Sequence, residues 1–215
     1  MKQFVKDKIT LLQCDCLDYM KDVPDKHFDL AIVDPPYGIK RGGQTETFTK
    51  NPKHKRKAHK QKEWDSDRPT DEYWGELFRV SKCQIVWGAN YFSGFLAPSM
   101  GWVVWDKGQD LSMSDGELAY TSFDRALRIV RINRGELARE GTIHPTQKPI
   151  KLYKWLLKNY ATPDMKIIDT HGGSMSSMIA CHDFGCEAVC CEIDEEYFDA
   201  AIKRFDNETR QLTCF

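Results

Sequence analysis

The stretch IIDTHGGSMSSMIACHDFGCEAVCCEID, residues 167–194, decides the fold. It begins as a buried strand that ends at Asp169, passes through a turn of small residues at 172–174, and continues as a helix that ends at Gly185. A second apolar strand follows and finishes on the acidic Glu192. A strand, a small-residue turn, a helix and a second strand with a terminal carboxylate are typical of a nucleoside-binding βαβ unit.

The two carboxylates of this unit indicate which nucleoside it binds. Glu192 at the end of a strand can accept hydrogen bonds from both ribose hydroxyls. Asp169 at the mouth of the turn would repel a pyrophosphate but would attract a cationic amino acid group. This pattern favours S-adenosylmethionine over NAD, although a purely structural strand-to-helix turn would explain the two glycines nearly as well.

The same alternation of strands and helices extends along the whole chain. Apolar runs predict strands, and helical periodicity after Thr70, after Pro149 and near the C-terminus predicts helices. The predicted strands cover residues 9–14, 28–34, 83–88, 101–106, 117–123, 126–132, 165–170 and 187–194. We therefore expect an α/β fold in one domain, residues 1–215, with a mostly parallel twisted sheet and helices on both faces.

Composition excludes several classes of protein. The apolar runs are too short to cross a bilayer and the N-terminus lacks a signal-peptide core, so we expect a cytoplasmic protein. The eight cysteines include no CxxC pair, which argues against zinc and favours buried, reduced thiols. The formal net charge of −1 argues against a uniformly basic nucleic-acid binder.

Positive charge is nevertheless concentrated in one segment. Residues 40–62 contain nine lysines and arginines and a single acid, Glu46, with almost no large apolar side chain. Such a run is usually a solvated loop, and we interpret 40–63 as one. It follows directly on the stretch VDPPYGI, residues 33–39, whose two prolines must end a strand because they cannot donate ladder hydrogen bonds.

Three motifs carry a family resemblance. DPPY (34–37), HPTQKP (144–149) and DTHGGSMSS (169–177), in that order, resemble those of the permuted β-class DNA amino-methyltransferases, which act on adenine N6 or cytosine N4. The likeness covers nearly the whole chain. It implies a Rossmann-like, S-adenosylmethionine-dependent methyltransferase fold with a circularly permuted order, in which the catalytic motif precedes the glycine turn.

The resemblance also implies the catalytic roles. Asp34 and the carbonyl of Pro35 would accept the two hydrogens of the target amine on a base flipped out of the duplex. Two acceptors would stabilise the positive charge that grows on this nitrogen during attack. Pro36 would hold the corner rigid and Tyr37 would stack on the base.

Further site residues follow from the same resemblance. Asp15 would contact the cofactor adenine, Glu192 the ribose, and Thr146 and Lys148 the methionine carboxylate. The residues implied to bind the cofactor are Asp15, Cys16, Thr146, Lys148, Asp169, His171, Gly172, Gly173, Ser174 and Glu192. Asn90 and Tyr91 would form a wall of the base pocket, and no metal is implied.

The chain departs from the family pattern in two places. Thr170 and His171 replace a Pro-Phe pair, and Met175 stands where a second glycine is common; a Cβ makes positive φ costly there. Residues 124–143 are a short, arginine-rich segment in the place of the usual target-recognition region. We hypothesise that this segment and the basic loop contact DNA. The residues expected to do so are Lys53, Lys55, Arg56, Lys57, Lys60, Arg128 and Arg131.

Several readings of the function stay open. The aspartate that begins DPPY favours adenine N6, since cytosine N4 enzymes more often carry serine there. Methylation of RNA or of a protein glutamine is a second reading, and a non-catalytic nucleic-acid-binding protein with a lost cofactor site is a third. The partners that the resemblance implies are double-stranded DNA, a second copy in a homodimer and a cognate restriction endonuclease.

Overall fold

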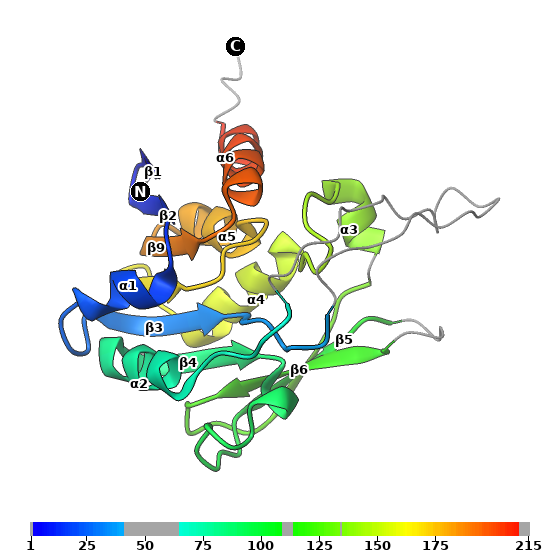
Figure 1. Ribbon diagram of the computed structural model, residues 1–215. Helices are drawn as coiled ribbons and strands as arrows, with labels where there is room; N and C mark the ends of the chain where they lie inside the picture. The colour runs from blue at the N-terminus through cyan, green and yellow to red at the C-terminus, as the bar shows by residue number, and fades with distance from the viewer. Residues whose placement is uncertain (1, 41–64, 109–113, 134, 211–215) are drawn as a thin grey trace.

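The structure is a computed structural model that describes residues 2–40, 65–108, 114–133 and 135–210 (Figure 1). Within these ranges nine strands form one sheet in the order β1-β2-β9-β8-β3-β4-β6-β5-β7. The strands are β1 (Lys2–Lys6), β2 (Ile9–Gln13), β3 (Phe28–Val33), β4 (Ser81–Trp87), β5 (Trp102–Asp106), β6 (Gly116–Thr121), β7 (Arg128–Arg131), β8 (Lys166–Asp169) and β9 (Glu187–Glu192). The helices are α1 (Cys16–Lys21), α2 (Asp71–Val80), the short 3-10 helix η2 (Ala89–Tyr91), α3 (Gly135–Glu140), α4 (Ile150–Tyr160), α5 (Ser176–Phe184) and α6 (Glu195–Glu208).

The sheet is largely parallel, as predicted. Strands β2, β9, β8, β3 and β4 are each parallel to their neighbours within this group, and β7 is parallel to β5. Among the described strands, only β1 and β6 pair antiparallel with the strands beside them. The carboxyl ends of the central strands therefore meet at one edge, where α/β proteins place their binding sites.

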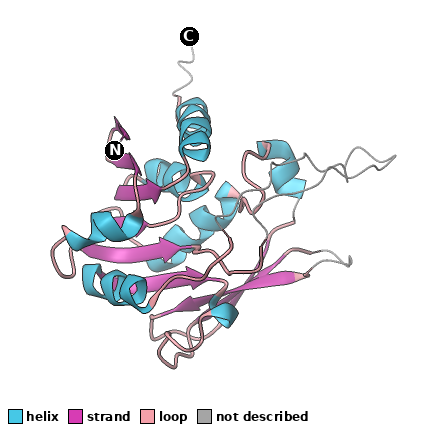
Figure 2. Cartoon of the chain, in the orientation of Figure 1, coloured by secondary structure: helices cyan, strands magenta, loops and turns pink. Residues whose placement is uncertain are grey.

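Helices cover both faces of the sheet (Figure 2). The alternation of side chains along β3 explains this arrangement, because Leu30 and Ile32 pack into the core beneath α4, α5 and α6, whereas Ala31 and Val33 pack into the core beneath α1 and α2. A strand must be apolar where it is buried on both faces, which is why residues 30–33 read as a continuous apolar run, whereas Asp29 near the start of the strand is only partly buried.

The helix ends follow local sequence signals. Thr70 caps α2 by accepting a hydrogen bond from the amide of Tyr73, and Asp194 caps α6 in the same way. Pro149 stands at the N-cap of α4, and Gly185 ends α5 with a φ of 85°. The sequence analysis missed β1, α3 and η2, which are short and show no clear periodicity.

Two predictions from composition can be compared with the described residues. All seven cysteines in these ranges are free, but only four of them, Cys181, Cys186, Cys190 and Cys191, are buried as expected. No helix among the described residues combines the length and the apolar character that crossing a membrane requires.

Candidate functional site

A cavity of about 310 Å³ opens at the edge of the sheet where the parallel strands end. It brings together segments that are far apart in the sequence: the start of α1, the corner after β3, the turn after β8, the end of β9 and the HPTQKP segment. The residues that line it are Cys14, Asp15, Cys16, Asp34, Pro36, His144, Thr146, Gln147, Lys148, Tyr153, Thr170, His171, Gly172, Gly173, Ser174, Glu192, Ile193 and Tyr197. Most of the predicted cofactor residues are therefore neighbours in space.

The turn after β8 is shaped by Gly172 and Met175. A Cβ on Gly172 would lie 2.5 Å from the Cys190 sulfur and 2.6 Å from the Met175 sulfur, so only glycine fits. Met175 itself adopts a φ of 58° and is fully buried. Met175 thus adopts a left-handed backbone conformation, and its side chain compensates for the strain by filling the space beneath the turn.

Replacing Met175 by glycine tests this explanation. Glycine would relieve a left-handed conformation that costs about 1–2 kcal/mol, but it would empty a buried site whose loss typically costs about 2–5 kcal/mol. We expect the free energy of unfolding to fall by about 1–3 kcal/mol, measured by urea denaturation. A variant more stable than the wild type would show that strain, and not packing, dominates at this position.

Glu192 fastens the turn to the end of β9. One carboxylate oxygen accepts a hydrogen bond from the Gly173 amide (2.7 Å), and the other accepts from the Asp194 amide (2.8 Å). The side chain also lines the cavity, and burial raises its pKa to about 7. A carboxylate in this place can accept hydrogen bonds from a ligand hydroxyl group.

Asp169 has a different position from the predicted one. We expected it to line the cavity, but it is buried beneath the turn, where its carboxylate accepts hydrogen bonds from the Ser177 hydroxyl and the His171 amide. Burial raises its pKa to about 6. Asp169 therefore holds the turn in shape, because one donor from the turn and one from the start of α5 point back at the end of β8.

His171 lines the cavity as an uncharged ring. Burial lowers its pKa to about 4, so the imidazole is neutral at physiological pH. Its Nδ1 lies 2.9 Å from the Thr170 hydroxyl, which in turn lies 2.7 Å from the hydroxyl of Tyr73 on α2. The residues that replace the family's Pro-Phe pair are thus fixed by a polar chain that reaches the next helix.

The start of α1 forms another part of the cavity wall. Asp15 is exposed at the N-cap, where its carboxylate accepts from the Leu17 amide (2.8 Å). Burial raises the pKa of Cys16 to about 12, so its thiol stays protonated. Both predicted residues therefore border the cavity, one as an acceptor and one as an apolar contact.

The corner after β3 is braced by its own tyrosine. The Tyr37 hydroxyl donates to one Asp34 oxygen (2.5 Å), and the Tyr37 ring stacks on Tyr91 with centroids 4.9 Å apart. The same ring packs so closely on Gly88 that a Cβ there would lie 2.1 Å from it. Asn90, on the same short helix as Tyr91, is exposed.

Asp65 is a residue of this corner that the sequence analysis missed. Its carboxylate accepts hydrogen bonds from the amides of Tyr37 (2.7 Å) and Gly38 (3.0 Å), and its carbonyl accepts from the Lys40 amide (3.0 Å). Asp65 thus fixes the backbone directly after DPPY. It lies 28 residues further along the chain than Tyr37, and nothing in its local sequence marks it.

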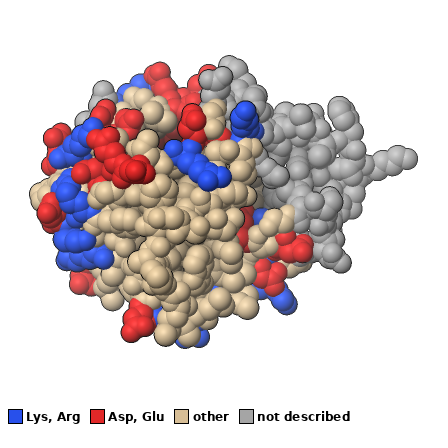
Figure 3. Space-filling view, turned by 60° about the horizontal axis from the view of Figure 1, so that its bottom comes forward, with Lys and Arg blue, Asp and Glu red and all other residues tan. Residues whose placement is uncertain are grey.

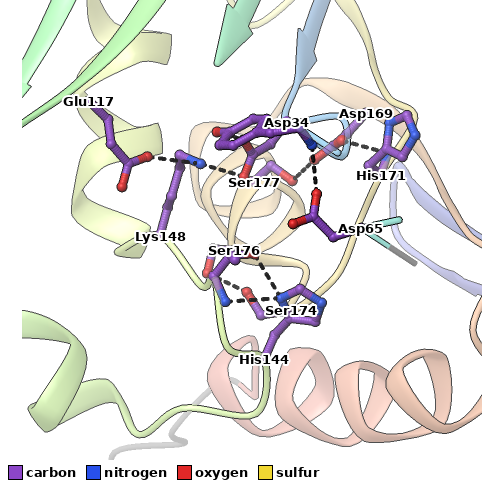
Figure 4. Close-up of polar contacts among 12 residues, drawn as sticks. Asp34, Asp65, Glu117, His144, Lys148, Asp169, His171, Ser174, Ser176 and Ser177 are labelled. Carbon is purple, nitrogen blue, oxygen red and sulfur yellow. Dashed lines mark hydrogen bonds and ion pairs between the residues drawn. The ribbon is translucent and has the colours of Figure 1, made fainter. Parts of the chain in front are cut away.

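Lys148 lines the cavity and contacts the corner after β3. Its ammonium group pairs with the other Asp34 oxygen and lies 3.3 Å from Glu117 (Figure 4). The predicted contact with a cofactor carboxylate stays a prediction. Glu117 pairs in turn with Lys107 at 2.8 Å. Glu117 and Lys107 were not singled out from the sequence.

Further contacts hold the cavity wall. His144 and Thr146 of the HPTQKP segment lie together, with the Thr146 hydroxyl 3.1 Å from Nδ1 of His144. Arg204 of α6, another residue that the sequence analysis missed, is buried and donates to the Ser174 carbonyl (2.6 Å) and the Ser176 hydroxyl (3.0 Å).

The residues expected to contact DNA are only partly described. Arg131 is exposed at the carboxyl end of β7 and pairs with Asp106 at 2.7 Å. Arg128 begins the same strand beside Val103, which puts it toward the end of the sheet away from the cavity. The basic residues Lys53, Lys55, Arg56, Lys57 and Lys60 lie outside the described residues.

Charge does not mark a DNA-binding surface on the face that Figure 3 shows. In the view of Figure 3, lysines and arginines alternate with acids around a broad uncharged centre. Within the described ranges, no three histidine, cysteine or acidic side chains are grouped so that they could hold a metal ion.

Comparisons with known proteins agree with the motif analysis. A sequence model of the DNA methylase family for N6 and N4 enzymes matches residues 46–203, which begin after the Asp34–Tyr37 corner. No curated protein sequence matches the chain.

Several solved structures share the fold. The M1.HpyAVI–SAM complex has a TM-score of 0.63 at 19% identity, over 91% of this chain and 99% of that chain. TTHA0409 from Thermus thermophilus, complexed with S-adenosyl-L-methionine, has a TM-score of 0.58 at 13% identity, over 94% of this chain and 96% of that chain. The cytosine-N4-specific PvuII DNA methyltransferase has a TM-score of 0.62 at 12% identity, over 92% of this chain and 86% of that chain. At these identities the shared property is the fold, and the predicted Rossmann-like methyltransferase architecture is confirmed.

Proposed function

Because the chain belongs to the DNA methylase family of N6 and N4 amino-methyltransferases, we propose that it methylates the exocyclic N6 of adenine in double-stranded DNA, using S-adenosylmethionine. The observation that carries the proposal is the shared cavity. Asp34, an acceptor suited to an amine, lines the same space as Glu192 and the glycine turn, which are suited to a nucleoside. An acceptor for the nucleophile beside a cradle for the donor is what methyl transfer to nitrogen requires.

The residues around the cavity fit S-adenosylmethionine. Glu192 would accept from the ribose hydroxyls, while Asp15 and Cys16 would border the adenine. The turn at 172–174 allows close approach of the backbone, and Thr146 offers a hydroxyl to the amino acid end. The bound cofactor would supply a methyl group activated by the positive sulfur.

The corner after β3 would prepare the nucleophile. An aromatic amine is a poor nucleophile because its lone pair is delocalised into the ring. Asp34 and the Pro35 carbonyl would accept its two hydrogens and so favour a tetrahedral nitrogen. The contacts of Asp65 and of Tyr37 with this corner support the role, since acceptors that are already fixed need no reorganisation during the reaction.

The choice of adenine depends on residue 34. Aspartate at the start of the tetrapeptide favours adenine, and cytosine N4 is the alternative base. If the target base is adenine, Tyr37 and Tyr91 would contact a flipped purine. Tyr37 is now stacked on Tyr91, so we propose that the base either joins this stack or displaces one ring.

Analysis of methylated nucleosides tests the proposal. DNA of mixed sequence would be incubated with the protein and S-adenosylmethionine, digested to nucleosides and measured by mass spectrometry. We expect N6-methyladenine. N4-methylcytosine in its place would reverse the choice of base, and no methylated nucleoside at all would contradict the proposed activity.

The remaining assignments are proposals that follow from this function. DNA phosphates would be bound by the basic residues within 40–63 together with Arg131, because lysine and arginine supply most salt-dependent affinity for DNA. Arg128 is a weaker candidate in view of its position. A single catalytic domain over residues 1–215, a homodimer, a cognate restriction endonuclease and a place in the cytoplasm would be consistent with a DNA-modifying enzyme.

A further inference from the structure

Four charged side chains form a row that leads away from the cavity. Asp34 pairs with Lys148, Lys148 lies 3.3 Å from Glu117, and Glu117 pairs with Lys107 at 2.8 Å. The four residues come from the corner after β3, the HPTQKP segment, β6 and the end of β5. Of these four, Asp34 and Lys148 line the cavity, so Glu117 and Lys107 belong to a layer behind it.

Tryptophan rings form the floor of this row. The Lys148 ammonium lies 5.3 Å from the centre of the Trp87 ring, and the Lys107 ammonium lies 5.2 Å from that of Trp105. Both indoles are buried, and the Lys148 side chain is only 3% exposed. An ammonium group in such surroundings must be paired, because burying an isolated charge is very unfavourable.

The position of Lys148 poses a problem for the proposed chemistry. An ammonium group bound to Asp34 alone would cancel most of the negative charge of that acceptor. It would also stand beside an amine that becomes positive during methyl transfer, and like charges at this distance repel. Glu117 changes this balance because it offers Lys148 a second carboxylate on the side away from the cavity.

We propose that Glu117 is a positioning residue for the methyl transfer, acting through Lys148 and held in place by Lys107. By sharing the Lys148 ammonium, Glu117 draws positive charge away from Asp34, while Lys148 still fixes the Asp34 carboxylate in one orientation. This inference rests on the proposed function and deepens it, since it adds a residue that tunes the acceptor.

The ionisation of the row agrees with this role. Burial raises the pKa of Glu117, but the two neighbouring lysines lower it further, to about 2. Glu117 is therefore ionised throughout the physiological pH range. Burial would lower the pKa of Lys148, but Asp34 and Glu117 together raise it. Glu117 and Lys148, the two residues in the middle of the row, are therefore both charged at physiological pH.

The test replaces Glu117 by glutamine, which keeps its shape and removes its charge. Single-turnover rates at saturating DNA and cofactor should fall about 100-fold, the scale of effect that a misplaced catalytic group produces. The KM for S-adenosylmethionine should stay within about twofold of the wild type, because Glu117 does not line the cavity. Glu117→Asp should recover part of the rate, since it restores the charge.

A double-variant cycle shows whether the effect passes through Lys148. In a Lys148→Met background, Glu117→Gln should have little further effect on the rate. Glu187→Gln is the matched control, because Glu187 pairs with Lys166 at the opposite edge of the sheet and should leave the rate unchanged.

Two results would overturn the inference while leaving the proposed function intact. One is a Glu117→Gln variant that methylates DNA at the wild-type rate, and the other is an undiminished effect in the Lys148→Met background. A wild-type protein without any methylation activity would overturn the proposed function, and the inference with it.

Discussion

Replacing Asp34 by asparagine should lower the rate of methyl transfer by roughly 1000-fold, the upper range for losing one group that stabilises transition-state charge. Asparagine keeps the shape of the side chain and can still accept a hydrogen bond, but it cannot compensate the positive charge that grows on the amine. It also leaves the buried Lys148 with Glu117 as its remaining carboxylate partner among the contacts of this row. The rate would be measured by transfer of a radiolabelled methyl group in a single turnover.

The affinity for S-adenosylmethionine separates this effect from misfolding. Glu192 and the glycine turn do not depend on Asp34, so isothermal titration should give an affinity within about threefold of the wild type. Asp29→Asn is the matched control, since Asp29 lies near the start of β3, the strand that leads to Asp34, does not line the cavity and pairs with Lys82. Full activity of Asp34→Asn would contradict the proposed role of Asp34.

Much of the fold could be predicted because its signals are local. Each central strand contains an apolar run, and Thr70, Pro149 and Asp194 mark helix starts by the chemistry of their own side chains. Among the strands, β1 is the exception, because its sequence KQFVK is mostly polar and exposed. An edge strand needs apolar residues on one face only, so a segment of five residues carries too little pattern to be recognised.

The cavity could be predicted where motifs define it, but its supporting contacts could not. DPPY, HPTQKP and the glycine turn each contain recognisable residues, and the cavity contains members of all three. Asp65, Glu117 and Arg204 act across long separations in sequence, and each is one acid or base among many. Their importance arises only from the partners that the fold brings to them.

Asp169 and Lys148 illustrate the same limit. Their motifs could be recognised from the sequence, but the sequence does not say which way the two side chains point. Asp169 is turned inward by Ser177, and Lys148 is drawn to Asp34, which is 114 residues away in the chain. Met175 is a similar case, because the packing that supports its backbone is not local either.

Glu192 is expected to have the second-largest effect, on cofactor affinity. Hydrogen bonds to a charged acceptor contribute about 1.5–3 kcal/mol each, so Glu192→Gln should weaken S-adenosylmethionine binding about 100-fold at about pH 8 if both ribose hydroxyls donate to the carboxylate. Glutamine preserves the side-chain length and one acceptor oxygen, which can still bind the Gly173 amide but leaves the Asp194 amide without its acceptor. Isothermal titration measures the dissociation constant directly.

The pH dependence of binding makes this prediction specific. Burial raises the pKa of Glu192 to about 7, so the free carboxylate is mostly protonated at pH 6 and mostly ionised at pH 8. Because the ionised form is the stronger acceptor, wild-type affinity should increase as the pH rises through about 7. The Glu192→Gln variant should lack this increase, whereas Glu195→Gln, a change at an exposed residue that pairs with Lys2, should retain it. Equal affinities for the wild type and Glu192→Gln across this pH range would show that Glu192 serves only to fasten the turn.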